Sequence, residues 1–179
     1  MNEFTLLIDA EIPRLRRYAR ALAQGEGFRA DDLVQETLLR AVSKQHLWQP
    51  GSNLRAWLFT VMHNQYVNEV RRSVREGATV DVDKHCDRFP SISDPSASLL
   101  LRDLERALAK LPIERRQAIL LVGLEGMSYE EAAQVLDIPI GTLRSRMSRG
   151  RAQLRHLMCM DADDDARSAP ALPLEKRAA

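Results

Sequence analysis

"SYEEAAQVLDIPIGTLRSRMSRGR", residues 128–151, decides the fold of the second half of this chain. Ser128 and Glu131 have the spacing of a capping box, in which each side chain accepts a hydrogen bond from the backbone N–H of the other residue. A helix is therefore predicted to begin directly after Ser128. Asp137–Pro139 ends that helix, and the chain restarts near Gly141 into a second, arginine-rich helix. Two helices joined by a tight turn, the second of them basic, are typical of a helix-turn-helix.

Charge is segregated along the chain, although the whole chain is almost neutral. Its 179 residues include 26 Lys+Arg and 25 Asp+Glu, with a formal net charge of +1. Residues 140–156 nevertheless carry five arginines and no acid, whereas residues 161–179 carry five acids and three bases. A phosphate backbone meets the local charge, so this segregation matters more than the sum.

The second helix of the motif can present its arginines to DNA. Leu143, Met147 and Leu154 are predicted to face the core, which leaves the polar positions on the other faces. Arginine can bind guanine or phosphate, and serine is small enough to let a helix approach the major groove. The alternative is a solvated basic helix that pairs with acidic neighbours. The capping box, the turn and the restart together favour DNA binding.

The composition indicates an ordinary helical globular protein. Hydrophobic residues make up 45% of the chain, charged residues 28% and aromatic residues only 5%, which favours helices over sheets. No apolar run approaches the roughly 20 residues that span a bilayer, and the N-terminus lacks a signal pattern. We therefore expect no membrane insertion and a cytoplasmic location. Cys86 and Cys159 stand in no CxxC or Cys/His pairing, so no disulfide framework is expected.

Two helical blocks flank a polar middle segment. In the first block a short apolar stripe ends near Ile8, and Pro13 is predicted to open a separate second helix. Gln24–Phe28 breaks that helix, and further helices are predicted from Asp31 and from Leu54. The fold class is therefore all-α, with two small helical domains joined by a flexible linker. The predicted segments are the first domain at 1–72, the linker at 73–98, the second domain at 99–160 and a disordered tail at 161–179.

Three stretches resemble one known family, in that family's order. Leu111–Leu154 resembles region 4 of an extracytoplasmic-function (ECF, group 4) sigma factor of the sigma-70 family. "DDLVQETLLRA" (Asp31–Ala41) is similar to region 2.2, and Pro50–Arg72 is similar to regions 2.3 and 2.4. The segments "PGSNLRAWLFTV" and "LVGLEGMSYEEAA" resemble the alphaproteobacterial general-stress branch of this family. The first domain would then be sigma region 2 and the second would be sigma region 4.

This resemblance implies a role in transcription initiation. A sigma factor binds RNA polymerase core through the β′ clamp and the β flap, directs it to promoter DNA and helps to open the duplex. An anti-sigma factor usually controls such proteins, and the branch implies a stress response. The resemblance implies no catalytic site, no cofactor and no metal.

The resemblance also implies a polymerase-binding surface on the helix that begins at Asp31. The positions that match this surface are Asp32, Gln35, Glu36 and Leu39. For any one of them, helix capping or simple solvation is an alternative role.

The loop Trp48–Leu54 matches the part of the family that captures a flipped base of the minus-ten element. Asn64 matches a position at that pocket, and the arginines would hold the single strand. Trp57 has the apolar spacing of a core residue rather than of a stacking platform. The predicted minus-ten residues are Trp48, Ser52, Asn53, Arg55, Asn64, Arg71 and Arg72.

The second helix of the motif matches the family's recognition helix for the minus-thirty-five element. Ser145, Ser148 and Arg149 are expected near base edges. The expected phosphate contacts are Thr142, Arg144, Arg146 and Arg151.

Three other functions are alternatives to a sigma factor. A sigma-like decoy sequesters an anti-sigma factor without binding promoters, but such domains tend to lose the basic helix that this chain keeps. An ordinary helix-turn-helix regulator leaves the first block unexplained. An enzyme is disfavoured because Asp161–Asp165 lacks the glycine turn and closing glutamate of a calcium loop, and no catalytic constellation stands out.

Overall fold

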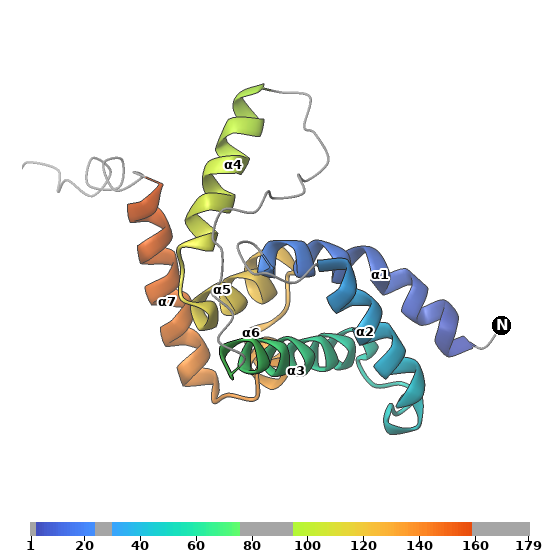
Figure 1. Cartoon of the computed structure of the whole chain (residues 1–179). Coiled ribbons are helices and arrows are strands. Elements are labelled where there is room, and N and C mark those ends of the chain that lie inside the picture. Colours follow the sequence, from blue (N-terminus) through green and yellow to red (C-terminus); the bar gives the residue numbers. More distant parts are fainter. Residues whose placement is uncertain (1–2, 24–29, 76–94, 159–179) are drawn as a thin grey trace, which may run out of the picture.

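The structure is a computed structural model that describes residues 3–23, 30–75 and 95–158. All its regular elements in these ranges are helices, which confirms the predicted all-α class. The N-terminal domain comprises α1, α2, the short 3₁₀ helix η1 and α3, and the C-terminal domain comprises α4, α5, the π-helical turn η2, α6 and α7 (Figure 1). The predicted tail, Cys86, Cys159 and most of the predicted linker lie outside the described residues. The bounds are α1 Glu3–Leu22, α2 Ala30–Ser43, η1 Gln45–Leu47, α3 Leu54–Arg75, α4 Pro95–Ala109, α5 Ile113–Ile119, η2 Leu120–Leu124, α6 Tyr129–Val135 and α7 Ile140–Leu157.

The helix α1 runs without interruption through Pro13, so the predicted separate helices before and after this proline are wrong. Proline lacks a backbone N–H and removes one helical hydrogen bond. Ile8 and Leu15 lie two turns apart on either side of it and are both buried. Packing of this shared apolar face therefore keeps the helix continuous across the proline.

The N-terminal domain is a three-helix bundle with an aromatic centre. Tyr18 and Phe59 meet edge to face, with ring centroids 5.2 Å apart. At one end Phe4 lies 5.3 Å from Trp48 and 6.2 Å from Trp57, again between ring centroids. Trp57 packs against the core, as its spacing predicts. These contacts fix the start of α3, where the predicted minus-ten loop is attached.

The helix-turn-helix forms as the sequence predicts. The Ser128 hydroxyl accepts from the Glu131 N–H at 3.1 Å, and the Glu131 carboxylate accepts from the Ser128 N–H at 2.9 Å, which completes the capping box of α6. Asp137 takes a left-handed backbone conformation, with φ of 51°, within the turn that follows α6. Pro139 then precedes the first residue of α7.

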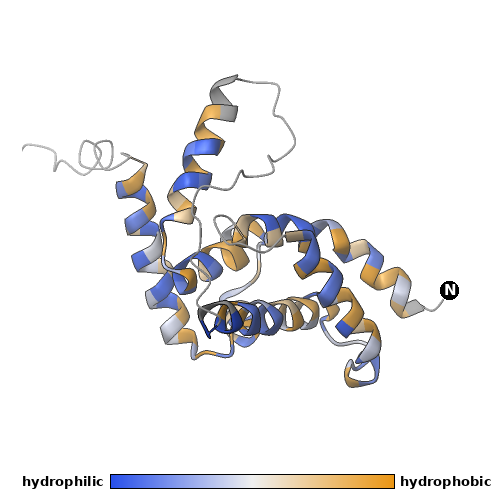
Figure 2. Cartoon of the chain, in the orientation of Figure 1, coloured by the Kyte–Doolittle hydropathy of each residue, from blue (hydrophilic) through white to orange (hydrophobic). Residues whose placement is uncertain are grey.

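The two domains pack against each other. The helix α3 lies beside α6, and α1 contacts η2 (Figure 1). The buried apolar side chains of both domains form one hydrophobic cluster. Hydrophobic and hydrophilic residues alternate along the helices, as expected for amphipathic helices (Figure 2). The described parts of the two domains are therefore joined by a packed interface as well as by the covalent linker.

Candidate nucleic-acid interface

The helix α7 presents a basic face that is free of acidic residues. Leu143 and Met147 are 0% and 2% exposed, so this side of the helix is held in the core, as predicted. Leu154, the third predicted core position, is half-buried. The exposed members of the predicted minus-thirty-five set are Arg144, Ser145, Ser148, Arg149 and Arg151, and the half-buried ones are Thr142 and Arg146.

The orientation of α7 is fixed where it crosses α5. A Cβ at Gly150 would lie 2.7 Å from Cδ1 of Ile119 and 3.4 Å from Cβ of Arg115, so only glycine fits this approach without displacing a neighbour. Arg115 also donates a hydrogen bond of 2.8 Å to the Gln153 side chain on α7. The direction in which the exposed arginines point is therefore set by packing on the opposite side of the helix.

The predicted minus-ten loop borders an open groove. Gly51 has a φ of +86°, which permits the tight turn after Pro50, and Ser52 donates to the Gln49 carbonyl at 2.7 Å. The groove holds about 470 Å³ and is partly apolar. Its lining residues are Phe4, Leu7, Gln45, Trp48, Pro50, Gly51, Ser52 and Leu54. The structure thus brings Trp48 and Ser52 of the predicted set to one concave surface.

The other predicted minus-ten residues are spread along α3. Asn64, Arg71 and Arg72 are exposed, and none of them lines the groove beside the loop. Arg72 lines a separate groove of about 520 Å³ together with Asp32 and Glu36, which were predicted to bind polymerase.

The predicted polymerase-binding residues lie on the outer face of α2. Asp32, Gln35 and Leu39 are exposed, and Leu39 is 67% accessible to solvent. Glu36 is half-buried and pairs with Arg40 at 2.8 Å within the helix. The four predicted residues are thus accessible on one helix, with Leu39 as the exposed apolar side chain among them.

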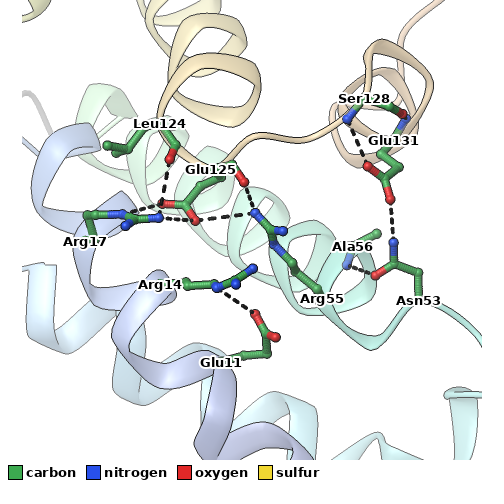
Figure 3. Close-up of polar contacts among 10 residues, drawn as sticks. All are labelled: Glu11, Arg14, Arg17, Asn53, Arg55, Ala56, Leu124, Glu125, Ser128 and Glu131. Atoms are coloured by element: carbon green, nitrogen blue, oxygen red, sulfur yellow. Dashed lines mark hydrogen bonds and ion pairs between the residues drawn. The ribbon is translucent and has the colours of Figure 1, made fainter.

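A buried carboxylate joins the two domains. The Glu125 side chain has no solvent-exposed area, and Arg17 from α1 donates to its two oxygens from Nε and Nη2, both at 3.0 Å (Figure 3). Arg55 from the first turn of α3 contacts the Glu125 backbone carbonyl and lies 3.6 Å from the carboxylate. Arg17 also donates to the Leu124 carbonyl at 3.3 Å. Two arginines of the N-terminal domain therefore complete the C-terminal end of α5 and η2.

A second link connects the starts of two helices. Asn53 caps α3, since its Oδ1 accepts from the Ala56 N–H at 3.0 Å. Its Nδ2 donates to the Glu131 carboxylate at 2.6 Å, and the same carboxylate belongs to the capping box of α6 (Figure 3). One glutamate thus serves the N-termini of helices from both domains.

Arg116 connects the domains in the opposite direction, from the C-terminal domain to the end of α1. It is 5% exposed and donates to the carbonyl of Leu22, the last residue of α1, at 3.0 Å. It also donates to the carbonyls of Ala109 and Leu111 at 3.0 and 3.3 Å. A cation from the C-terminal domain therefore completes the C-terminus of a helix in the N-terminal domain.

Two pKa shifts reflect this interface. Hydrogen bonding to Glu125 raises the pKa of Arg17, against the opposing effect of its own burial. Burial lowers the pKa of His63 on α3, and the positive charge of Arg146 adds to this effect, while Asp137 opposes it. Since Arg146 and Asp137 belong to the C-terminal domain, docking of the domains favours a neutral His63.

Sequence reasoning missed these interface residues. Glu125 offered one signal: it is an acid inside the apolar stretch "LVGLEGM" and has no basic residue one helical turn away. Arg17 and Arg116 offered none, because each stands among other arginines and only the tertiary structure distinguishes it.

Within the described ranges, no helix is long and apolar enough to cross a membrane. The same residues contain no cluster of three or more histidine, cysteine or acidic side chains that could hold a metal ion.

Comparisons with known proteins agree with this architecture. Residues 8–63 match the model of the sigma2 domain of PhyR, and residues 101–154 match the model of sigma-70 region 4. The chain is 42% identical over 156 residues to the ECF RNA polymerase sigma factor EcfG of Rhodopseudomonas palustris, covering 87% of this chain and 85% of that protein. It is 36% identical over 175 residues to the ECF RNA polymerase sigma factor SigE of Mycolicibacterium smegmatis, covering 94% of this chain and 66% of that protein.

A solved structure extends the likeness to three dimensions. The sigma factor RpoE of Bartonella quintana, in complex with the anti-sigma factor NepR, matches with a TM-score of 0.76 and 36% identity. This match covers 90% of the present chain and 99% of that chain.

Two helical domains, the second with a helix-turn-helix that exposes a basic helix, define a class of DNA-binding transcription proteins. Within this class, the chain belongs to the ECF family of RNA polymerase sigma factors. The EcfG relative and the PhyR sigma2 model are consistent with the predicted general-stress branch.

Proposed function

We propose that this protein binds RNA polymerase core and directs promoter-specific transcription initiation in a stress response. The observation that carries the proposal is the exposed, acid-free basic face of α7, which is held in place by the buried Leu143 and Met147. A rigid basic helix on a helix-turn-helix can enter a major groove and bind both bases and phosphates. In this role Ser145, Ser148 and Arg149 read the minus-thirty-five element.

The minus-ten element would be read by the N-terminal domain. The groove beside the loop is large enough for a flipped base, and the Trp48 ring contributes to its wall. Arg71 and Arg72 would follow the single strand along the exposed face of α3. Asn64 would contribute to base recognition.

The partners follow from the surfaces and from the relatives. Polymerase core would dock on α2 through Asp32, Gln35, Glu36 and Leu39. An anti-sigma factor would control the protein, as NepR forms a complex with the Bartonella relative. The protein would act in the cytoplasm, without catalytic chemistry of its own.

Run-off transcription with core polymerase on a promoter library tests the proposal. The wild type is expected to transcribe from a subset of promoters with two conserved elements, and Arg149→Ala should weaken or redirect that choice. Arg106→Ala is a matched control, because Arg106 is an exposed arginine of the same domain that lies on α4 and pairs with Asp103. Absence of both transcription and core binding would reject the proposal.

A decoy that sequesters an anti-sigma factor is the second candidate. The match of residues 8–63 to the sigma2 domain of PhyR favours it. The basic face of α7 argues against it, since a decoy has no use for DNA contacts. Binding to an anti-sigma factor without any binding to core polymerase would establish the decoy.

A further inference from the structure

We propose that an apolar pocket under α4 binds a small amphipathic cation, an ammonium ion attached to an apolar body of about six to eight carbons. The pocket lies where α4 meets the end of α1, the η2 turn and α7. None of the described residues that line it belongs to the proposed DNA or polymerase contacts. The inference therefore stands apart from the proposed function.

One wall of the pocket is formed by α4, which packs on the rest of the molecule only towards its C-terminal end. Ala107 and Leu108 are buried there, whereas Leu100, two turns earlier, is 58% exposed. Figure 1 shows the N-terminal part of α4 projecting away from the other helices. Leu101 and Leu104 lie between these two parts of the helix, and both line the pocket.

The opposite wall is formed by η2, a π-helical turn, and such turns occur frequently at functional sites. Gly123 in this turn lines the pocket without a side chain. A Cβ at this position would come no closer than 4.0 Å to another side chain, at Cγ2 of Ile119. Ala21, from the last turn of α1, contributes only a methyl group. Small residues on this side therefore leave room for a ligand.

The size and the lining of the pocket fit a single ring or a short chain. Its volume is about 190 Å³, and nine of its ten lining residues are leucine, isoleucine, alanine or glycine. An apolar cavity of roughly 150 Å³ with similar walls binds benzene. Pockets for drug-sized ligands are larger, at roughly 300–1,000 Å³. The ligand that fills this pocket is therefore small and mainly apolar.

Glu105 determines the charge of the ligand. It is the tenth lining residue, and its side chain is half-buried. Burial raises the pKa of its carboxyl group, while the positive charge of Arg102 opposes this effect. The next arginine of α4, Arg106, pairs with Asp103 at 3.4 Å. An ammonium group beside Glu105 would replace the hydration that the carboxylate loses and would donate a charge-assisted hydrogen bond to it.

Titration of the full chain with 2-phenylethylammonium tests the proposal. Methyl NMR of the labelled leucines should show shifts at Leu101, Leu104 and Leu154, which all line the pocket. Leu39 on α2 is the internal reference and should not shift, because it lies outside the pocket. The expected Kd is roughly 0.1–1 mM, as for other ligands of about nine non-hydrogen atoms.

Two variants separate the effect of charge from the effect of space. Glu105→Gln keeps the shape of the side chain and should weaken ammonium binding about five- to tenfold, while binding of the neutral 2-phenylethanol stays unchanged. Asp103→Asn is the matched control, because it removes the same charge from α4 at a residue that does not line the pocket. Gly123→Leu should abolish binding of both compounds by filling the pocket. Circular dichroism confirms that the helices persist in each variant.

Several outcomes would overturn the proposal. Pocket leucines that do not shift with 2-phenylethylammonium would reject the site, and equal binding of the anion 3-phenylpropanoate would reject its preference for a cation. Equal weakening by Glu105→Gln and Asp103→Asn would show a general attraction to the acidic residues of α4. None of these results depends on promoter-specific transcription, so the proposed function stands or falls separately.

Discussion

Glu125 shows how a single side chain can be both buried and charged. Burying a carboxylate costs several kcal/mol unless partners replace its hydration. Here Arg17 donates two hydrogen bonds to the carboxylate. Arg55, from another helix, places a second positive charge beside it. Arg17 itself is 44% exposed, so solvent screens part of this attraction. The cluster therefore contributes more to the choice of domain arrangement than to overall stability.

The exposed residues of α7 should divide into two energetic classes. We expect Arg149→Ala to cost about 1–3 kcal/mol of specific binding and to relax the preference at one base pair, because a base contact is lost. Arg151→Ala should weaken binding to all sequences alike and reduce the slope of log affinity against log salt by about 1, because a phosphate contact is lost. Fluorescence anisotropy at several salt concentrations checks both. Identical effects of the two changes would contradict the assignment.

His63 makes the docked structure sensitive to acid. Its pKa lies below the ordinary value of about 6.5 when folded, so the unfolded chain binds more protons as the pH falls through this range. The contribution of His63 to the free energy of unfolding should therefore be fully present above about pH 7 and decrease as the pH falls through 6.5 towards the folded pKa. Protonation would place a positive charge near Arg146 and disturb the 3.2 Å hydrogen bond to Gln117.

Urea unfolding at pH 7.5 and 5.5 measures this loss. His63→Phe should remove a distinct part of the pH dependence. His46→Phe serves as the control, since His46 is exposed on η1. An unchanged pH dependence in the His63 variant would contradict the assignment.

At the scale of elements, the capping box of α6 contributes directly to the stability of the C-terminal domain. Ser128→Ala should lower the free energy of unfolding by about 1 kcal/mol, which corresponds to a decrease of about 2–4 °C in melting temperature for a chain of this size. Ser43→Ala should change little, because its hydroxyl bonds only to the exposed end of α2. Differential scanning calorimetry compares the two variants. A melting temperature for Ser128→Ala equal to that of the wild type would show that the cap contributes nothing.

Local signals in the sequence were sufficient to predict most of the helices. The capping box, the Asp137–Pro139 turn and the buried Leu143 and Met147 all follow from spacing and turn chemistry, which act within a few residues. The prediction of a new helix at Pro13 was wrong for the same reason. The proline rule is local, whereas the packing of Ile8 and Leu15 that overrides it depends on the rest of the domain.

The candidate site was predictable only in part. Exposure of Arg149 and Arg151 follows from helical periodicity, and the structure agrees. The bonds from Asn53 to Glu131 and from Arg55 to Glu125 connect residues 78 and 70 positions apart. No local pattern in the sequence predicts such pairs, because they depend on how the two domains are arranged.

At the scale of the whole molecule, Arg116 connects three chain segments. It satisfies carbonyls at the ends of α1 and α4, so its removal leaves these acceptors without a donor. Arg116→Met should lower the free energy of unfolding by about 2–4 kcal/mol, measured by urea denaturation. Arg115→Met is the neighbouring control and should cost about 1 kcal/mol or less, because its bond to Gln153 stays within one domain. Equal losses would contradict a special role for Arg116.

The crossing at Gly150 has a practical consequence for engineering this protein. It holds α7 on the side opposite to Arg144, Ser148 and Arg149, which are all exposed to solvent. A library randomised at positions 144, 148 and 149 could therefore be screened for new promoter preferences while the fold of the C-terminal domain is kept. Such a library should leave out Gly150 at this crossing, as well as the buried Leu143 and Met147, because these positions hold α7 on the rest of the domain.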